Sequence, residues 1–322
     1  MASAEIPVLD IGDDAIADAV REACFGSGFF YITGHGVPET SITAAFEANR
    51  WLHARSDAEK LAIKLNRWHR GYQPLASSTL KSSQRFAPAQ YPNQLESFLL
   101  RHEVAPDAPG YGTRLLMGPN QWPADARFRE VITQYDAAIR ALGHRMLRIF
   151  AVSVGEDPAF FARFFAPAST ALRLIHYPPA PAGRPEDLYG IHPHTDYGFL
   201  TLLAQDDVGG LEVRRPDGTW IRVRPIPGTF ILNVGDVLAR WTNDRFNSTP
   251  HRVVNASADR DRYSIAMFFD PHIDAQIEAL PRFVREAGGA DRTKYPPIRY
   301  EDYYAMRLEA NFPDRVGVAP ER

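Results

Sequence analysis

Hydrophobic and polar positions divide the chain into two parts with different periodicities. In the first part, apolar positions at helical spacing over about 13–24 and 39–65 flank a β-branched and aromatic run at 28–33. A longer amphipathic helix is predicted over 124–154, where one apolar stripe contains Val131, Tyr135, Ile139, Leu142, Met146 and Ile149. Residues 66–123 are rich in proline and show no sustained period, which favours loops of the kind that cover a binding site.

From residue 171 onward, short apolar and β-branched runs alternate with turn signals. The runs are LRLIHY, FLTLLAQ, GLEVRR, TWIRVRP, TFILNV, HRVVNA and RYSIAMFF. Strands of this length and spacing are typical of an antiparallel double-sheet barrel or jelly roll, and they argue against βαβ units. Asp217-Gly218 lies between two of the runs and predicts a hairpin. The sequence therefore predicts a mainly β fold with flanking α-helices.

We expect residues 1–322 to form a single cooperative unit. The predicted regions are an N-terminal part with helices, strands and pocket-covering loops (5–123), a long support helix (124–165), the jelly-roll core (168–272) and a C-terminal helical extension (273–322). Helices at both ends of the β region favour one folding unit over two independent domains.

Composition narrows the range of functions. Lys and Arg total 36 against 39 for Asp and Glu, so the net charge of −3 predicts no basic track for nucleic acid. A single cysteine excludes a disulfide framework, a zinc ribbon and an iron–sulfur cluster. No run of apolar residues is long enough for a membrane span, and the N-terminus does not resemble a signal peptide. We therefore expect a cytoplasmic protein without a membrane or nucleic-acid partner, and most simply a monomer.

The candidate chemistry lies in three predicted strands. His194 and Asp196 stand two positions apart, so in an extended segment their side chains point the same way, and His251 opens a later strand. Two imidazoles and one carboxylate, with coordination positions left open, form the ligand set expected of a non-haem Fe(II) that must also bind O₂ and an organic molecule. Neither short motif is specific alone, because a second His-x-Asp pair occurs at His272 and Asp274. The informative signal is the combination of His194, Asp196 and His251, in this order, on predicted strands.

Arg262 and Ser264 follow His251 on the next predicted strand. A 2-oxo acid that chelates iron leaves a second carboxylate at its far end, and Arg262 with Ser264 could bind that group through charge-assisted hydrogen bonds. Strand parity places Phe268 on the same face as this pair, and parity in LRLIHY groups Tyr177 with Arg173. Tyr177 is thus a candidate donor to the same carboxylate, and Phe268 a candidate wall of the substrate pocket.

Several runs together resemble one known family. HTDYGFLTLLAQDDVGGLEV, DGTWIRVRPIPGTFILNVGDVLARWTN, STPHRVVN and RYSIAMFF resemble the catalytic core of the isopenicillin N synthase-like Fe(II)/2-oxoglutarate-dependent dioxygenases, and IPVLDI with GFFYITGHGVP resembles their N-terminal region. The resemblance implies a cupin-like double-stranded β-helix with flanking helices. It implies Fe(II) bound by His194, Asp196 and His251, and 2-oxoglutarate bound by Arg262, Ser264 and Tyr177.

The activity implied by this resemblance is oxidative. Such an enzyme uses O₂ and 2-oxoglutarate to hydroxylate, desaturate or cyclise a small molecule, with release of succinate and CO₂. Many members carry asparagine two positions before the tyrosine, whereas this chain has Ile175 there. Residues expected near the substrate are Phe268, Arg85, Phe98, Leu100, His102 and Arg173, and Arg85 and Arg173 are the candidates if the substrate carries a carboxylate.

Other polar residues near these motifs fit structural roles. We expect His192 to support the site or lie at the surface, His176 to face away from it because its parity is opposite to that of Tyr177, and Asn233, Gly235 and Asp236 to shape a turn.

Four alternatives stay open on the sequence. The nearest is an Fe(II) oxidase of the isopenicillin N synthase type that does not use 2-oxoglutarate, because both types share the Arg-x-Ser motif. A non-catalytic small-molecule-binding barrel would not need all three ligands together with both carboxylate-binding residues. A zinc hydrolase could use similar ligands but has no need of Arg262 and Ser264. A nucleic-acid demethylase would share the chemistry, but the charge balance provides no basic surface for it.

Overall fold

The larger β-sheet is the frame of the molecule. The computed structural model describes residues 6–13, 15–79, 86, 89–180, 183–255, 257–287 and 292–311. Within them the larger sheet has eight strands, in the order β1 (Val8–Asp10), β2 (Phe29–Thr33), β10 (Phe230–Val234), β7 (Leu200–Gln205), β12 (Arg262–Asp270), β5 (Ser169–Tyr177), β4 (Glu96–Arg101) and β3 (Gly71–Gln73). Only β1 and β2 pair in parallel; the other neighbours in this sheet are antiparallel.

A smaller antiparallel sheet lies against the larger one. Its order is β6 (Ile191–His194), β11 (His251–Val253), β8 (Leu211–Arg214) and β9 (Trp220–Arg222). The turn that contains Gly218, at a φ of 89°, joins β8 to β9, which confirms the hairpin predicted from Asp217-Gly218. Apolar side chains from both sheets pack between them in a core cluster that is separate from the main core under the helices. The fold is the double-stranded β-helix that the sequence predicted.

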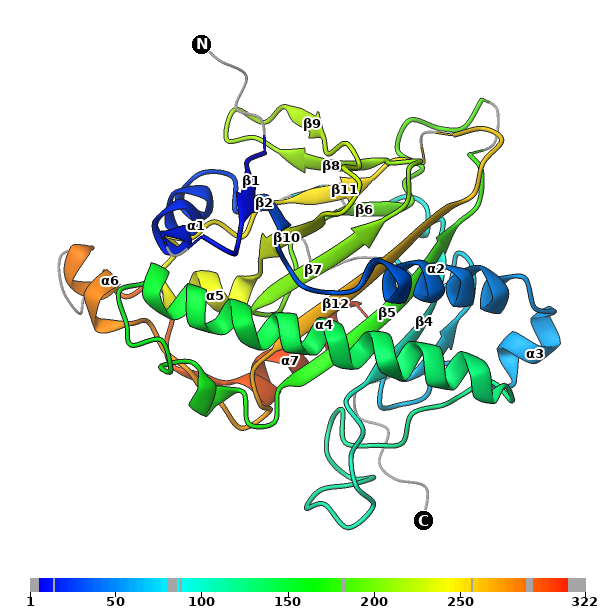
Figure 1. The fold of residues 1–322 in the computed structure, drawn as a ribbon, viewed down its shortest axis with the longest axis horizontal. Helices are drawn as coiled ribbons and strands as arrows, with labels where there is room; N and C mark the ends of the chain where they lie inside the picture. Colours follow the sequence, from blue (N-terminus) through cyan, green and yellow to red (C-terminus); the bar gives the residue numbers. More distant parts are fainter. Residues whose placement is uncertain are drawn as a thin grey trace.

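Helices α1 (Ile16–Phe25), α2 (Glu39–His53) and α4 (Ala126–Ser153) cover the outer face of the larger sheet (Figure 1). The other helical segments are α3 (Asp57–Leu61), a 3-10 turn (Ala162–Phe164), α5 (Asp236–Trp241), α6 (Pro281–Glu286) and α7 (Tyr300–Asn311). A short ladder of β13 (Gln276–Ile277) and β14 (Ile298–Arg299) precedes α7. No helix in the described part of the chain is both long and apolar enough to cross a bilayer.

The long helix α4 begins where its sequence provides a cap. The Asp125 carboxylate accepts a hydrogen bond from the Phe128 backbone N–H at 2.6 Å. The buried stripe then packs on the sheet, and Gly143 allows the closest approach, since a Cβ there would lie 2.3 Å from the ring of Phe269 on β12. The helix ends at Ser153, which confirms the helix predicted over 124–154.

Two regions differ from the sequence predictions. The helix expected over 39–65 is broken into α2 and α3, because Ser56 forms a capping box with Glu59 that begins a new helix. The region 66–123, expected to be irregular, contributes β3 and β4 to the larger sheet. β4 pairs with β5 along its whole length, and this tertiary pairing outweighs the weak local signal of its sequence.

A network of charged side chains lies on the helix-covered face of β5. His176 contacts a carboxylate with each ring nitrogen, Glu96 through Nδ1 and Asp261 through Nε2, both at 2.7 Å. Lys60 binds the other oxygen of Glu96 at 2.9 Å, and the ring of His53 packs nearby. Burial alone would lower the pKa of His176, but the hydrogen bonds from its ring to Glu96 and Asp261 raise the pKa overall. His176 thus has a structural role, as its strand parity indicates.

Protonated His176 should therefore stabilise the fold at low pH. The raised pKa means that its contribution is complete below the unfolded-state value of about 6.5 and is lost as the pH rises through the folded-state pKa. In urea denaturation, His176→Gln should lower the free energy of unfolding by about 1–3 kcal/mol near pH 6 and by less near pH 9. An equal loss at both pH values would contradict the charged state of His176.

Candidate active site

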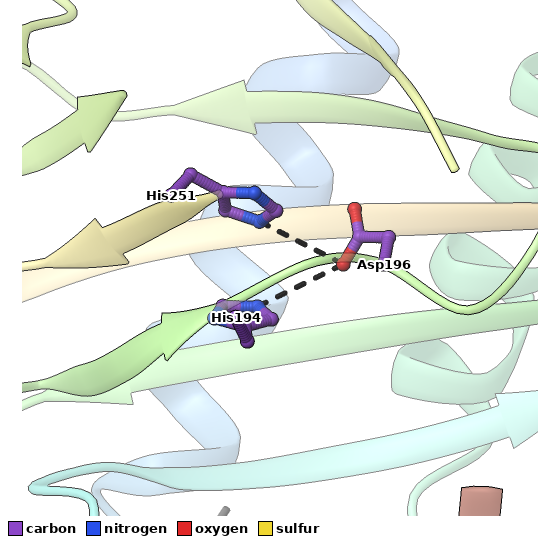
Figure 2. Close-up of side chains that lie close together, drawn as sticks. All are labelled: His194, Asp196 and His251. Carbon is purple, nitrogen blue, oxygen red and sulfur yellow. Dashed lines mark ion pairs between the residues drawn. The ribbon is translucent and has the colours of Figure 1, made fainter. Parts of the chain in front are cut away.

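His194, Asp196 and His251 converge at the end of the smaller sheet (Figure 2). His194 is the last residue of β6, His251 is the first of β11, and the antiparallel ladder pairs them directly. The Nε2 atoms of His194 and His251 lie 3.8 and 3.7 Å from the Oδ1 atom of Asp196. One donor atom from each residue lies within 4.8 Å of the others, so a single cation could contact all three.

Backbone carbonyl groups orient both imidazoles. The Nδ1 atom of His194 lies 2.7 Å from the carbonyl of His192, and that of His251 lies 3.2 Å from the carbonyl of Thr249. Since a carbonyl can only accept, each Nδ1 carries a proton, and Nε2 is the nitrogen that faces the centre. Burial, with the neighbouring His251, lowers the pKa of His194 to about 3. His192 supports the site through its backbone, as the sequence predicted.

The Asp196 carboxylate is fixed through its other oxygen. Its Oδ2 atom accepts hydrogen bonds from Thr201 at 2.5 Å and from Asn233 at 2.7 Å. These two residues are directly paired across β7 and β10. Burial alone would raise the pKa of Asp196, but the two imidazoles and these two hydrogen bonds lower it overall. The lowered pKa values of His194 and Asp196 favour a neutral imidazole and an ionised carboxylate, which are the protonation states that metal binding requires.

The role of Asn233 differs from the sequence prediction. Asn233 was expected to shape a turn, but it lies inside β10 with its side chain on Asp196. Thr201 was not singled out at all. Neither contact is visible in the sequence, because it depends on the register between β7 and β10.

The loop after Asp196 packs too closely to admit side chains at two positions. A Cβ at Gly198 would lie 1.6 Å from the carboxylate of Asp270, and one at Gly235 would lie 2.2 Å from the carbonyl oxygen of Gly198. Asp270 also accepts a hydrogen bond from the Phe199 backbone N–H at 2.9 Å, and Asp236 donates its backbone N–H to the Asp196 carbonyl at 2.8 Å. This packing fixes the backbone that carries Asp196.

A narrow cavity of about 60 Å³ leads from the three converging residues to a buried arginine. Arg262 is 2% exposed, its guanidinium lies 4.6 Å from the centre of the Tyr177 ring, and its Nη1 donates a long 3.5 Å hydrogen bond to Ser264. Among the described residues, its buried Nε atom has no hydrogen-bond partner and no carboxylate lies within ion-pair distance. A buried guanidinium in this state is suited to an anion that reaches it through the cavity.

A larger cavity of about 150 Å³ is lined by His194 and Asp196 but not by His251. The structure brings Arg173 and Phe268 into the walls of both cavities. The larger cavity is also lined by Gln73, Leu99 and Arg101 from the edge of the sheet, and by Tyr304 and Leu308 from α7. Sequence reasoning did not single out these residues.

Three of the residues expected near the substrate lie elsewhere. Phe98 and Leu100 belong to the main core beneath the sheet, where Phe98 packs on Phe128 of α4. Strand parity explains the correction, because Leu99 and Arg101 occupy the alternate positions of β4 that face the cavity. His102 lies beyond the end of β4 and lines a separate cavity with Ser169 and His272. Arg85 lies outside the described residues.

Two imidazoles and one carboxylate at the open end of a β-helix define a non-haem iron oxygenase as the class of protein that the fold and the site fit best. Residues 168–271 match the 2OG-Fe(II) oxygenase superfamily, and residues 6–125 match the N-terminal region of non-haem dioxygenases in morphine synthesis.

Individual relatives agree with this match. The chain is 38% identical to the 2-oxoglutarate-Fe(II) type oxidoreductase hxnY of Emericella nidulans, over 94% of this chain and 89% of that protein. It is 34% identical to the homoarginine-6-hydroxylase 2-ODD-C23.1 of Arabidopsis thaliana, over 94% and 91%. Its fold is similar to the crystal structure of a full-length Neurospora crassa protein in complex with alpha-KG and thymine, with a TM-score of 0.81, 30% identity and coverage of 95% and 96%.

The chain belongs to the 2-oxoglutarate- and Fe(II)-dependent oxygenase superfamily. The family resemblance, the enzyme class and the use of Fe(II), 2-oxoglutarate and O₂ predicted from the sequence are thereby confirmed.

Proposed function

We propose that His194, Asp196 and His251 bind the catalytic Fe(II), and that Arg262, Ser264 and Tyr177 bind the distal carboxylate of 2-oxoglutarate. The observation that carries this proposal is the narrow cavity itself: it has an incompletely paired, buried Arg262 at one end and the three converging side chains at the other. A short dicarboxylate with a keto group next to one carboxylate matches those two ends.

The prime substrate would occupy the larger cavity, with Arg173 and Phe268 in its walls. We propose a small molecule and hydroxylation as the reaction, supported by the relative named as a homoarginine-6-hydroxylase and by the thymine complex of the Neurospora crassa protein. We further propose that residues 1–322 work as a single unit, because one core cluster joins α1, α4, the larger sheet and α7. A cytoplasmic monomer that binds neither nucleic acid nor membrane fits the charge balance.

The protein's own groups prepare the site for this chemistry. When bound, Fe(II) would activate O₂ as the oxidant, and 2-oxoglutarate would supply two of the four electrons that O₂ accepts and leave as succinate and CO₂. Thr201 and Asn233 hold the Asp196 carboxylate, and carbonyl groups keep a proton on Nδ1 of each histidine. Arg262 neutralises the buried end of the co-substrate, and the apolar walls exclude water from the substrate C–H bond.

Removal of the carboxylate should abolish metal binding and turnover together. We expect Asp196→Ala to weaken Fe(II) binding by more than about a hundredfold, because it removes a charged ligand whose position is fixed on both sides. Anaerobic Fe(II) titration and succinate release measure the two effects. Asp107→Ala, at an exposed position, is the control. Full activity of the Asp196 variant would refute the ligand assignment.

Replacement of the buried arginine should act mainly on the co-substrate. Arg262→Gln removes the charge that faces the distal carboxylate, so the KM for 2-oxoglutarate should rise by roughly ten- to a hundredfold while Fe(II) affinity changes little. Steady-state 2-oxoglutarate consumption gives the KM, and Arg148→Gln at an exposed helix position is the matched control. An unchanged KM would place the distal carboxylate elsewhere.

Loss of the amide that holds Asp196 should weaken metal binding without removing a ligand. Asn233→Ala should lower Fe(II) affinity by about 10- to 100-fold, because one hydrogen bond that fixes the carboxylate is lost. Thr201→Ser, which keeps its hydroxyl, should retain near-normal affinity, whereas Thr201→Val should not. Anaerobic metal titration distinguishes the three. Equal affinities in all of them would mean that these hydrogen bonds do not support the ligand.

A further inference from the structure

The larger cavity presents hydrogen-bond donors that have no acceptor. Arg173 donates from Nε to Ser97 at 3.0 Å and from Nη2 to the Oε1 atom of Gln73 at 3.1 Å. Because Gln73 accepts through its oxygen, its amide nitrogen points away from Arg173, and this buried nitrogen has no partner among the described residues. Gln73 is 3% exposed and lines the cavity. A hydrogen-bond acceptor inside the cavity would satisfy it.

A second arginine faces the same cavity from the neighbouring strand. In the β4–β5 ladder, Arg101 pairs with Ala171 and Leu99 pairs with Arg173, so the two arginines are diagonal neighbours on one face. Arg101 is 3% exposed and donates to the Tyr304 hydroxyl at 2.6 Å, while its buried Nε atom has no partner in the described part of the chain. Two adjacent guanidinium groups repel each other unless an anion lies between them.

The carboxylates near this pair of arginines bind other groups. No described carboxylate lies within 4.0 Å of either Arg101 or Arg173. Of the two acidic residues in the cavity wall, Asp196 is held by Thr201 and Asn233 and faces the histidines. Asp270 accepts the Phe199 N–H, and its burial raises its pKa to about 6. Neither guanidinium is therefore paired directly with a carboxylate, although Asp196 and Asp270 lie in the same wall.

The remainder of the wall limits the size and the polarity of the ligand. Much of it is an apolar surface formed by Leu65, Leu99, Ile191, Phe268 and Leu308, and further polar groups come from His69, Ser78, Asn93, Thr195 and Tyr197. The volume of about 150 Å³ is comparable to that of an engineered protein cavity that holds one benzene ring. A compact hydrocarbon body would fill this space, with the polar group at the arginine end.

We propose that the prime substrate is a compact monocarboxylate with a body the size of a single ring, and that Arg101 and Arg173 bind its carboxylate. This inference rests on the proposed function, and it specifies the substrate class. Arg173 and the Gln73 amide bind one side of the carboxylate, and Arg101, held by Tyr304, binds the other. The body of the substrate then lies along Phe268 toward His194 and Asp196.

The test uses the anaerobic enzyme loaded with Fe(II) and saturating 2-oxoglutarate, with calorimetric titration of matched probes. The probes are benzoate and cyclohexanecarboxylate, their uncharged amides, and 2-naphthoate as a larger acid. We expect at least one single-ring acid to bind saturably, and its amide and the naphthoate to bind at least about tenfold more weakly, because a charge-assisted pair or the fit to the cavity is lost.

Variants locate the carboxylate. Arg173→Gln should weaken binding of the acid by about tenfold or more without changing the affinity for its amide, whereas Arg148→Gln should change neither. Arg101→Gln should weaken binding of the acid by a similar factor. If the Arg101 variant does not fold, the Arg173 variant alone tests whether the carboxylate binds here. Equal binding of acid and amide, an unchanged acid affinity in Arg173→Gln, or no binding of any acid would overturn the proposal.

The enzyme loaded with Fe(II) and 2-oxoglutarate should show a characteristic absorption band. This band tests the proposed co-substrate site separately from the proposed substrate class. If this band fails to form before any probe is added, the proposed co-substrate site is wrong. If the band forms normally but the acids bind no more tightly than their amides, the proposed co-substrate site is supported. The substrate is then an uncharged molecule with carbonyl acceptors.

Discussion

The pairing of β12 with β5 is the constraint on which the rest of the site depends. Nine consecutive residue pairs hold the two strands in one register, with Arg262 opposite Tyr177 and Ala266 opposite Arg173. The Arg262 and Arg173 positions are thus four residue pairs apart, or about 13 Å along the strands. That distance leaves room for the proposed iron ligands between two separate basic sites. A slip of either strand by one residue would turn the cavity-facing side chains of that strand into the helix-covered core.

The alternate residues of the same strands show why the register is stable. Ile265, Met267 and Phe269 point to the opposite face, where they are buried against α4 and the aromatic rings around it. Phe165 stacks on Phe269 at a centroid distance of 5.5 Å. Any slip would expose this apolar surface to the polar cavity and bury Arg262 among apolar side chains, and each change is costly. The core therefore fixes the position of the catalytic residues as well as the stability of the fold.

The sequence predicts those parts of the site that depend on local periodicity. Alternation within one strand was sufficient to group Arg262 with Phe268, and Arg173 with Tyr177, and the structure places each of these pairs on the cavity face. Helix α4 and the β8–β9 hairpin likewise follow from patterns contained in their own residues. In each case the information lies within a few residues of the position concerned.

The parts that the sequence did not predict depend on pairing between distant segments. Asn233 and Thr201 both contact Asp196 because the pairing of β10 with β7 aligns them. The sequence of neither strand indicates that register. The apolar run of β4 gave no sign of which alternate residues face inward, so Phe98 and Leu100 were selected where Leu99 and Arg101 line the cavity. The contribution of Tyr304 depends on how α7 returns to the sheet, which no local pattern encodes.

The ladder that pairs His194 with His251 has a consequence for the geometry of the proposed ligands. The spacing of these imidazoles is set by backbone hydrogen bonds and by the carbonyls of His192 and Thr249, all of which belong to the polypeptide itself. The separation of two of the three proposed ligands is therefore written into the polypeptide, so a change in the main chain at Thr249 or His192 would alter the ligand geometry without touching either imidazole.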